Sequence, residues 1–137
     1  MDDIGTSTYL QWLRNEFEES PFWKHMGITF DRFEPGDVII KMPVKKELGN
    51  SNGVMHGGAL TSILDSIIGA TIRSTREVRV ATISLTTQFI APVKEGTLYA
   101  RATLINDGKR IQYVESKAFN ERDETIGTAL GTFAILK

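Results

Sequence analysis

A single carboxylate stands in a stretch of the chain that is otherwise uncharged. Asp65 lies within residues 57–72, a run without proline whose apolar residues recur every three or four positions, which is the spacing of an α-helix. It lies about two turns inside that helix, too far from the first turn to cap amides or to favour the macrodipole. No lysine or arginine lies within four residues of it. A carboxylate in this setting indicates either a functional cleft or a helix face that is open to solvent.

The residues at the start of this helix can donate hydrogen bonds to a reacting carbonyl. His56, Gly57 and Gly58 come directly before the apolar run, and the first amides of a helix have no acceptor inside it. Glycine removes the Cβ atoms that would keep a ligand away from those amides. An oxyanion would be stabilised there, with His56 orienting the substrate. Alternatively, His56 and Asn50 only cap the helix and satisfy loop carbonyls.

Small and polar residues follow one side of the same helix. Gly58, Ser62, Asp65 and Gly69 are four, three and four residues apart, which places them on one strip. A glycine inside a helix costs about 1 kcal/mol relative to alanine, so we expect a second backbone or a ligand to approach closely. Gly57 and Asp65 are about 12 Å apart along a helix. If both act on one carbon, two chains must share the site.

The rest of the chain predicts a short helix and an antiparallel sheet. Residues 8–19 have helical spacing, and residues 26–32 and 38–42 flank a type II turn at Pro35-Gly36, which indicates a hairpin. Period-two alternation predicts strands at residues 81–91, 98–105, 111–119 and 125–136, with a tight reversal at Asp107-Gly108. This order predicts an α+β domain whose sheet packs on one central helix of residues 57–73. The open edges of such a sheet favour pairing between two subunits.

The strand at residues 81–91 carries hydroxyl groups on one predicted face. Strict alternation assigns Ile83, Leu85, Phe89 and Ala91 to one face, and Thr82, Ser84, Thr86 and Gln88 to the other. On this pattern Thr82 and Ser84 are neighbours on the same side of the sheet.

Composition excludes several classes of function. The 137 residues carry a net charge of −1 with interspersed signs, so nucleic acid is a poor partner. The absence of cysteine excludes disulfides, thiol catalysis and cysteine-bound metals. There is no run of about 18 apolar residues for membrane insertion, and the N-terminus is acidic where a secretory signal would be basic. We expect a soluble, cytoplasmic, single-domain protein over residues 1–137, with a helical extension at 1–24.

Two segments resemble a known family. Asn50-x-x-Gly53-x-x-His56-Gly57-Gly58, with an acid nine positions after the histidine, resembles the signature of hotdog-fold acyl-CoA thioesterases of the phenylacetate-degradation (PaaI-like) type. The segment ATISLTTQFIAPVKEG is similar to that family's strand, which ends in an aromatic residue, then a proline and a glycine turn. The similarity covers residues 26–137. It implies a hotdog fold, in which an antiparallel sheet wraps around one long helix, preceded here by a short N-terminal helix.

The resemblance also implies roles for the central residues. Asp65 would be the nucleophile or the general base acting on a thioester bound by the other subunit. The Gly57 amide would polarise the thioester carbonyl, and His56 and Asn50 would help to place the substrate and the attacking water. Thr82 would hold that water.

Further residues would then bind the substrate. The candidates are Gly58, Ser62, Ser84, Arg73, Lys109 and Arg110. The resemblance assigns the nucleotide end of coenzyme A to the last three of these, which could equally be solvated surface charges. It implies no metal and no cofactor, since coenzyme A is part of the substrate. The expected partner is a second copy of the chain in a homodimer, with a dimer of dimers as the expected larger assembly, although no motif marks the surfaces that would decide between dimer and tetramer.

Two functions therefore compete. The first is hydrolysis of an acyl-CoA thioester, and the second is a non-catalytic module that binds acyl-CoA or lipid on the same fold. Hotdog hydratases come last, because they resemble a histidine motif that this sequence lacks. Near the N-terminus, Trp12, Phe17, Phe22 and Trp23 either line an acyl channel or belong to the core.

Overall fold

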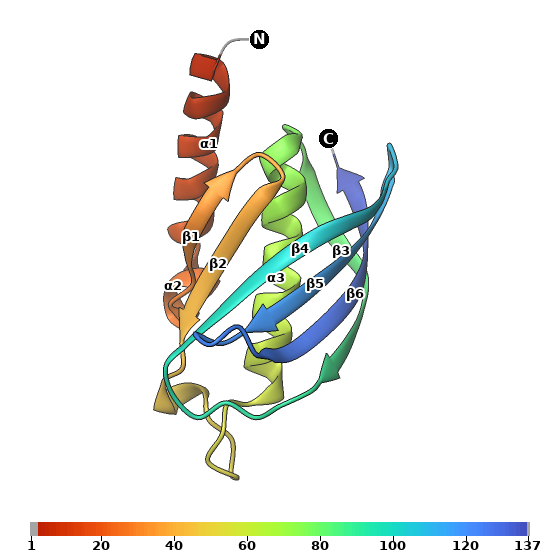
Figure 1. The fold of residues 1–137 in the computed structure, drawn as a ribbon. Helices are drawn as coiled ribbons and strands as arrows, with labels where there is room; N and C mark the ends of the chain where they lie inside the picture. The colour runs from red at the N-terminus through yellow and green to blue at the C-terminus, as the bar shows by residue number, and fades with distance from the viewer. Residues whose placement is uncertain (1–2, 137) are drawn as a thin grey trace.

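An antiparallel sheet wraps around one long helix in the computed structural model, which describes residues 3–136 (Figure 1). The elements follow the chain as α1 (Asp3–Glu18), α2 (Pro21–Met26), β1 (Thr29–Glu34), β2 (Asp37–Pro43), a 3₁₀ turn η1 (Lys46–Leu48), α3 (Gly57–Thr75), β3 (Arg79–Phe89), β4 (Thr97–Asp107), β5 (Ile111–Phe119) and β6 (Thr125–Leu136). The predicted α+β hotdog architecture is confirmed. Residues 1, 2 and 137 of the expected domain lie outside the described residues.

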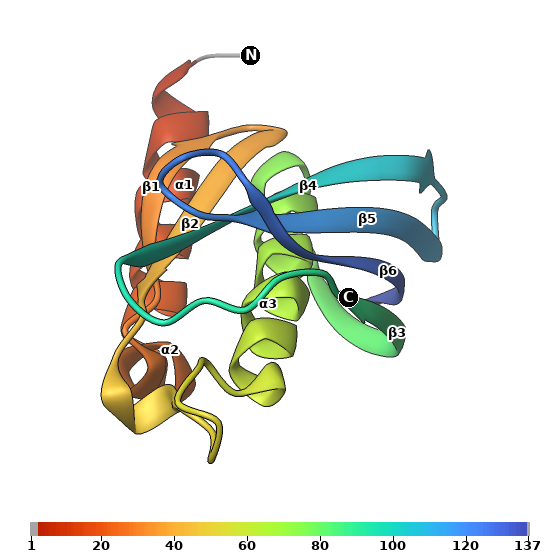
Figure 2. The ribbon, with the colours of Figure 1, turned by 60° about the horizontal axis from the view of Figure 1, so that its bottom comes forward.

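The sheet has six strands in the order β1-β2-β4-β5-β6-β3. Every neighbouring pair is antiparallel, so β1 and β3 form the two edges. Figure 2 shows the strands curving over one side of α3, with α1 beside β1. Among residues 3–136, no strand covers the opposite side of α3, which we call its open side.

The core forms where the apolar face of α3 meets the sheet. Ile63, Leu64, Ile67, Ile68 and Ile72 are fully buried in α3, and each such side chain contributes about 1.5–3 kcal/mol through burial. The apolar face predicted for this helix is also buried throughout and is therefore confirmed; it consists of Leu60, Ile63, Leu64, Ile67 and Thr71. Its burial fixes which side of α3 turns away from the sheet.

The first hairpin forms at the predicted turn. Gly36 has φ +72°, which a type II turn requires at its third position, and Glu34 pairs with Asp37 across it. The hairpin begins later than predicted, because Met26 belongs to α2 and β1 starts at Thr29. The short helix α2 was missed, although Pro21 at its first turn and Gly27 at its C-cap mark its ends.

The aromatic residues near the N-terminus divide into two groups. Trp23 is buried, and Phe17 packs against it with ring centroids 4.9 Å apart, so these two belong to the core. Trp12 and Phe22 are 49% and 50% exposed. Only these exposed rings remain available to line a substrate channel.

A bulge in β3 changes the faces that strict alternation predicts. Thr82 pairs with the buried Phe133 and points toward α3, whereas the register shifts before Ser84. Leu85 packs against the core, so Ser84 points to the outer face and Ile83 is exposed. The prediction that Thr82 and Ser84 share a face is wrong, since an extra residue in an edge strand reverses the alternation that follows it. Ser84 therefore does not belong to the candidate site.

Candidate active site

The structure joins Asp65 to Thr82. Asp65 is half-buried on the open side of α3, and its Oδ1 accepts a 2.8 Å hydrogen bond from Oγ1 of Thr82 on β3. The bond is exposed to solvent, which agrees with the alternative of a helix face that is open to solvent.

His56 caps the long helix. Its Nδ1 accepts a 2.7 Å hydrogen bond from the Gly58 amide, which requires the neutral ring with its proton on Nε2. The capping role expected as the alternative for His56 is confirmed. The bond also occupies the Gly58 amide, so Gly58 does not offer that donor to a substrate.

Gly57 keeps an available amide at the start of α3. As the first residue of the helix it has no acceptor inside it, and its amide meets no acceptor among the residues that the structure describes. The amide lies at the positive end of the helix dipole. Among the glycines at this helix start, Gly57 is thus the one whose amide can stabilise an oxyanion.

Asn50 organises the loop that leads into the helix. Its Oδ1 accepts hydrogen bonds from the amides of Asn52 and Val54, at 2.9 and 3.2 Å, and Gly53 completes the turn with φ +79°. Asn50 thus has a role in the loop, but its Oδ1 pairs with loop amides and not with the loop carbonyls that the alternative expected. Asn50 also lines a groove that contains Gly57.

The strip of small residues along α3 is only partly open. Ser62 donates its hydroxyl proton to the Gly58 carbonyl at 2.8 Å, so this proton is used within the helix. Gly69 is buried, and a Cβ added to it would meet Val80 at an ordinary distance of 3.7 Å. The expected close approach is therefore absent at Gly69, and the accessible part of the strip runs from Gly58 to Asp65.

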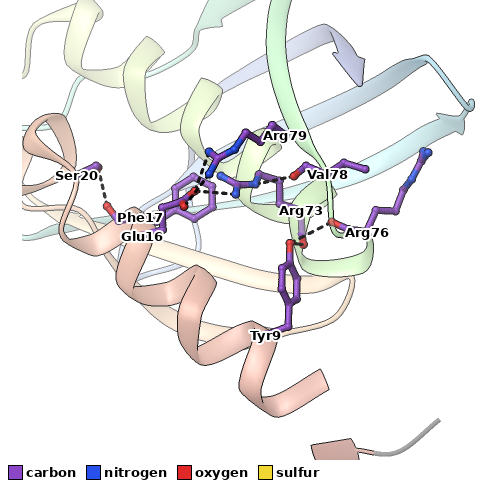
Figure 3. A network of polar contacts seen from close by, with 8 residues as sticks. All are labelled: Tyr9, Glu16, Phe17, Ser20, Arg73, Arg76, Val78 and Arg79. Atoms are coloured by element: carbon purple, nitrogen blue, oxygen red, sulfur yellow. Dashed lines mark hydrogen bonds and ion pairs between the residues drawn. The ribbon is translucent and has the colours of Figure 1, made fainter. Parts of the chain in front are cut away.

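The guanidinium of Arg73 is buried and paired within the chain. The residue is 7% exposed, its Nη2 contacts Glu16 at 2.7 Å, and its Nε donates to the Val78 carbonyl at 2.9 Å. Glu16 also contacts Arg79 at 3.1 Å (Figure 3). The prediction of Arg73 as a coenzyme A ligand is wrong, because its guanidinium is already used to hold α1 against α3 and β3.

The same network determines the ionisation of Glu16. Burial opposes the charged form, but hydrogen bonds and charges from Arg73 and Arg79 outweigh it and hold the pKa of Glu16 below its ordinary value. Tyr9 adds a bond from its hydroxyl to the Arg73 carbonyl at 2.8 Å, and burial raises its pKa. No local pattern could have revealed this network, since Glu16 and Arg73 are 57 positions apart in the chain.

Lys109 and Arg110 lie on the exposed hairpin between β4 and β5. Arg76 donates a 3.0 Å hydrogen bond to the Gly108 carbonyl, which places this hairpin at the carboxyl end of α3, at the opposite end from Gly57. The assignment of these two residues to a nucleotide stays a prediction.

Two grooves lie beside β3, one at each end of the strand. One, of about 310 Å³, lies between the first turn of α3 and the end of β3, and it includes Gly57, Phe89 and Ile90. The other, of about 770 Å³, lies between α1 and the start of β3, and it includes Trp12 and Arg79. From the sequence, Phe89 was predicted to lie on one face of the sheet, and no role in binding was predicted for it. The structure places it, exposed, in the wall of the smaller groove.

Residues 3–136 contain neither a cluster of metal-ligating side chains nor a membrane-spanning helix. In that part of the chain no three histidine, aspartate or glutamate side chains gather as a metal site would require. None of the helices described there is long and apolar enough to cross a bilayer.

Comparison with known proteins identifies the family. The chain belongs to the thioesterase superfamily, whose family model matches residues 52–126. That match contains His56, Gly57, Asp65 and Thr82. A curated relative, "Putative esterase Ta0293" from Thermoplasma acidophilum, is 28% identical over 126 residues, which are 91% of this chain and 96% of the relative.

Solved structures agree on the fold. The conserved protein PA5202 from Pseudomonas aeruginosa has a TM-score of 0.81 at 28% identity, with 85% of this chain and 94% of that chain covered. Thioesterase HI1161 from Haemophilus influenzae has a TM-score of 0.85 at 24% identity, covering 93% and 90%. The PaaI protein of the E. coli phenylacetic acid degradation operon has a TM-score of 0.83 at 22% identity, covering 92% and 93%. The last two show the hotdog fold alone, so the PaaI-like type stays a prediction.

Proposed function

We propose that this protein is an acyl-CoA thioesterase, which hydrolyses a thioester to a free carboxylic acid and coenzyme A at a site shared by two subunits. The observation that carries the proposal is the hydrogen bond between Thr82 and Asp65 on the open side of α3. A carboxylate held by a hydroxyl group and accessible to water is suited to general-base or nucleophilic chemistry.

The geometry of α3 supports a shared site. The helix is continuous from Gly57 to Thr75, so Asp65 and the Gly57 amide of one chain are about 12 Å apart along its axis. A thioester carbonyl cannot contact both. The proposal therefore joins Asp65 of one subunit with Gly57 of the partner subunit.

The free edge of β3 supports the pairing of two subunits. β3 is eleven residues long and ends the sheet order, so one of its sides has no neighbouring strand among the described residues. Ile83, at the bulge of this strand, is 57% exposed. Long apolar edge strands pair readily with a second copy, and a two-fold axis at this edge would complete two sites at once. We also propose that two such dimers associate into a tetramer.

The reaction would proceed through a tetrahedral intermediate. In the general-base form, Asp65 accepts a proton from water as the water oxygen attacks the carbonyl carbon. Gly57 of the partner subunit donates to the oxyanion. The carbon–sulfur bond then breaks, and the proton passes from Asp65 to the departing thiolate. In the nucleophilic form, an Asp65 oxygen attacks the carbonyl carbon, the carbon–sulfur bond breaks and coenzyme A leaves as its thiolate. Water then hydrolyses the resulting anhydride to the free acid and the Asp65 carboxylate, and the proton released passes to the thiolate. Thr82 orients the carboxylate in either form, and Lys109 and Arg110 are the proposed contacts for the nucleotide.

A thiol-release assay tests the function. We expect the wild type to release thiol from at least one member of a panel of aliphatic, phenylacetyl and benzoyl coenzyme A thioesters. Asp65→Asn is expected to lower kcat by about 10²- to 10⁴-fold, with folding intact by circular dichroism. Asp31→Asn, at an exposed acid of β1, is the matched control and should keep normal turnover. Binding of acyl-CoA without thiol release would identify the non-catalytic module instead.

A further inference from the structure

The groove at the first turn of α3 lies beside the amide that we assign to the thioester carbonyl. Its volume is about 310 Å³, at the lower end of the range of about 300–1,000 Å³ for small-molecule sites. It can hold only part of an acyl-CoA molecule. Because Gly57 itself lines the groove, the part that it holds must be adjacent to the carbonyl carbon.

Phe89 forms one wall of this groove. It is the last residue of β3 and is 60% exposed. A Cβ added to Gly57 would lie 3.2 Å from Cε1 of the ring, so the ring packs directly over the start of α3. Its partner across the sheet is Gly127, which has no side chain to hold the ring away. The ring therefore borders the Gly57 amide on one side and the groove on the other.

The lining of the groove selects for an uncharged occupant. No acidic or basic residue lines it, and Val54, Met55 and Ile90 contribute apolar surface. The Asn50 oxygen is already bonded to two loop amides. A charged group would lose hydration here without meeting a side chain of opposite charge, which is costly. The pantetheine arm of coenzyme A carries amides that need partners, so it fits this surface less well than an alkyl chain does.

We infer that this groove receives the acyl group of the substrate, that this acyl group is uncharged and apolar, and that the ring of Phe89 determines its preferred length. The inference rests on the proposed thioesterase function. It makes Phe89 a specificity-determining residue, which was not among the site residues expected from the sequence.

The larger groove beside α1 is the competing place for the acyl group. Three charged side chains line it, those of Arg73, Glu77 and Arg79. Arg73 is eight positions beyond Asp65 on α3, or about 12 Å along the helix. Trp12 lines this groove and is 49% exposed, so it offers a matched aromatic control for Phe89.

The test compares acyl length preference in Phe89→Ala, Phe89→Trp and Trp12→Ala. The assay measures kcat/KM for straight-chain acyl-CoA thioesters from acetyl to dodecanoyl, together with succinyl-CoA. One methylene in an apolar pocket changes kcat/KM by about 10- to 200-fold. We therefore expect Phe89→Ala to raise the ratio of long to short substrates by at least about ten-fold and Phe89→Trp to lower it. Trp12→Ala should leave the preferred length unchanged, and butyryl-CoA should exceed succinyl-CoA.

Several outcomes would overturn the inference. Unchanged length preference in both Phe89 variants would do so, as would a shift in Trp12→Ala alone or a preference for succinyl-CoA. Phe89→Leu, with circular dichroism, guards against loss of folding. If the wild type binds acyl-CoA without releasing thiol, calorimetric Kd values over the same panel must show the same shifts for the inference to stand. Failure of the thioesterase proposal is thereby separated from failure of the inference, and absence of all binding rejects both.

Discussion

Oγ1 of Thr82 donates a 2.8 Å hydrogen bond to Oδ1 of Asp65, which links an edge strand of the sheet to the open side of the central helix. A carboxylate oxygen has more than one acceptor site, so this bond orients Asp65 and leaves its second oxygen for a water or a substrate. The two residues are 17 positions apart, and the β3 bulge that follows Thr82 separates it from Ser84. This relationship and the α3 geometry lead to four predictions.

Removing the hydroxyl of Thr82 should impair turnover. We expect Thr82→Val to lower kcat by about 10- to 100-fold, since a hydrogen bond to a charged group is worth about 1.5–3 kcal/mol, while Thr82→Ser stays near the wild type. Steady-state thiol release measures the effect. Ser84→Ala is the matched control, because Ser84 points to the outer face of the sheet. Equal losses in Thr82→Val and Ser84→Ala would contradict the assigned faces.

Two inactive variants should restore activity when they form a mixed dimer. Asp65→Asn removes the carboxylate, and Gly57→Val adds a side chain that meets the ring of Phe89 and covers the amide. A mixed dimer has one site with both residues intact and one with neither. After unfolding and refolding together in equal amounts, random pairing should give about a quarter of wild-type activity. Activity no higher than that of the separate variants would show that the two residues do not meet across subunits.

Loss of the His56 side chain should weaken the start of α3. The bond from the Gly58 amide to Nδ1 of His56 is an N-cap, and removing a cap costs about 0.5–2 kcal/mol. We expect His56→Ala to lower the free energy of unfolding by that amount in urea denaturation. His56→Asn, which has a good capping oxygen, should recover most of the loss. A recovery of stability without a recovery of kcat/KM would indicate a second role for His56 with the substrate.

The stability contributed by Glu16 should depend on pH. The pKa of Glu16 is lowered in the folded state, so its contribution is complete above the pKa of the unfolded chain and is lost as pH falls through the lowered folded value. At neutral pH we expect Glu16→Gln to lower the free energy of unfolding by about 1–3 kcal/mol, from the loss of charged hydrogen bonds to Arg73 and Arg79.

Urea unfolding at several pH values measures this difference. It should shrink below about pH 4, where the unfolded glutamate binds its proton. Glu19→Gln, at an exposed acid next to α2, is the control and should show a much smaller difference. If the difference in the free energy of unfolding between wild type and Glu16→Gln stays constant down to pH 3, the ionisation of Glu16 is not linked to folding.

Local patterns in the sequence were enough to predict the main elements of this fold. Apolar spacing predicted the long helix, and strand alternation predicted β5 and β6 with the bounds that the structure has. The Pro35-Gly36 turn and the helix start at Gly57 were also predicted. These features depend on residues within a few positions of one another, because helix periodicity, turn conformation and capping are short-range effects.

The tertiary structure decided which side chains meet. The β3 bulge moved Ser84 off the face that holds Thr82, since a bulge depends on the register with β6 and not on the composition of β3 itself. Arg73 became a buried partner of Glu16, and Phe89 came to lie over Gly57. These contacts join residues far apart in the chain, so only the packing of α1, α3 and β3 against one another could place them. The sequence by itself determined the hydroxyl, carboxylate and amide groups available for chemistry, and the packing of these elements decided which of them lie together.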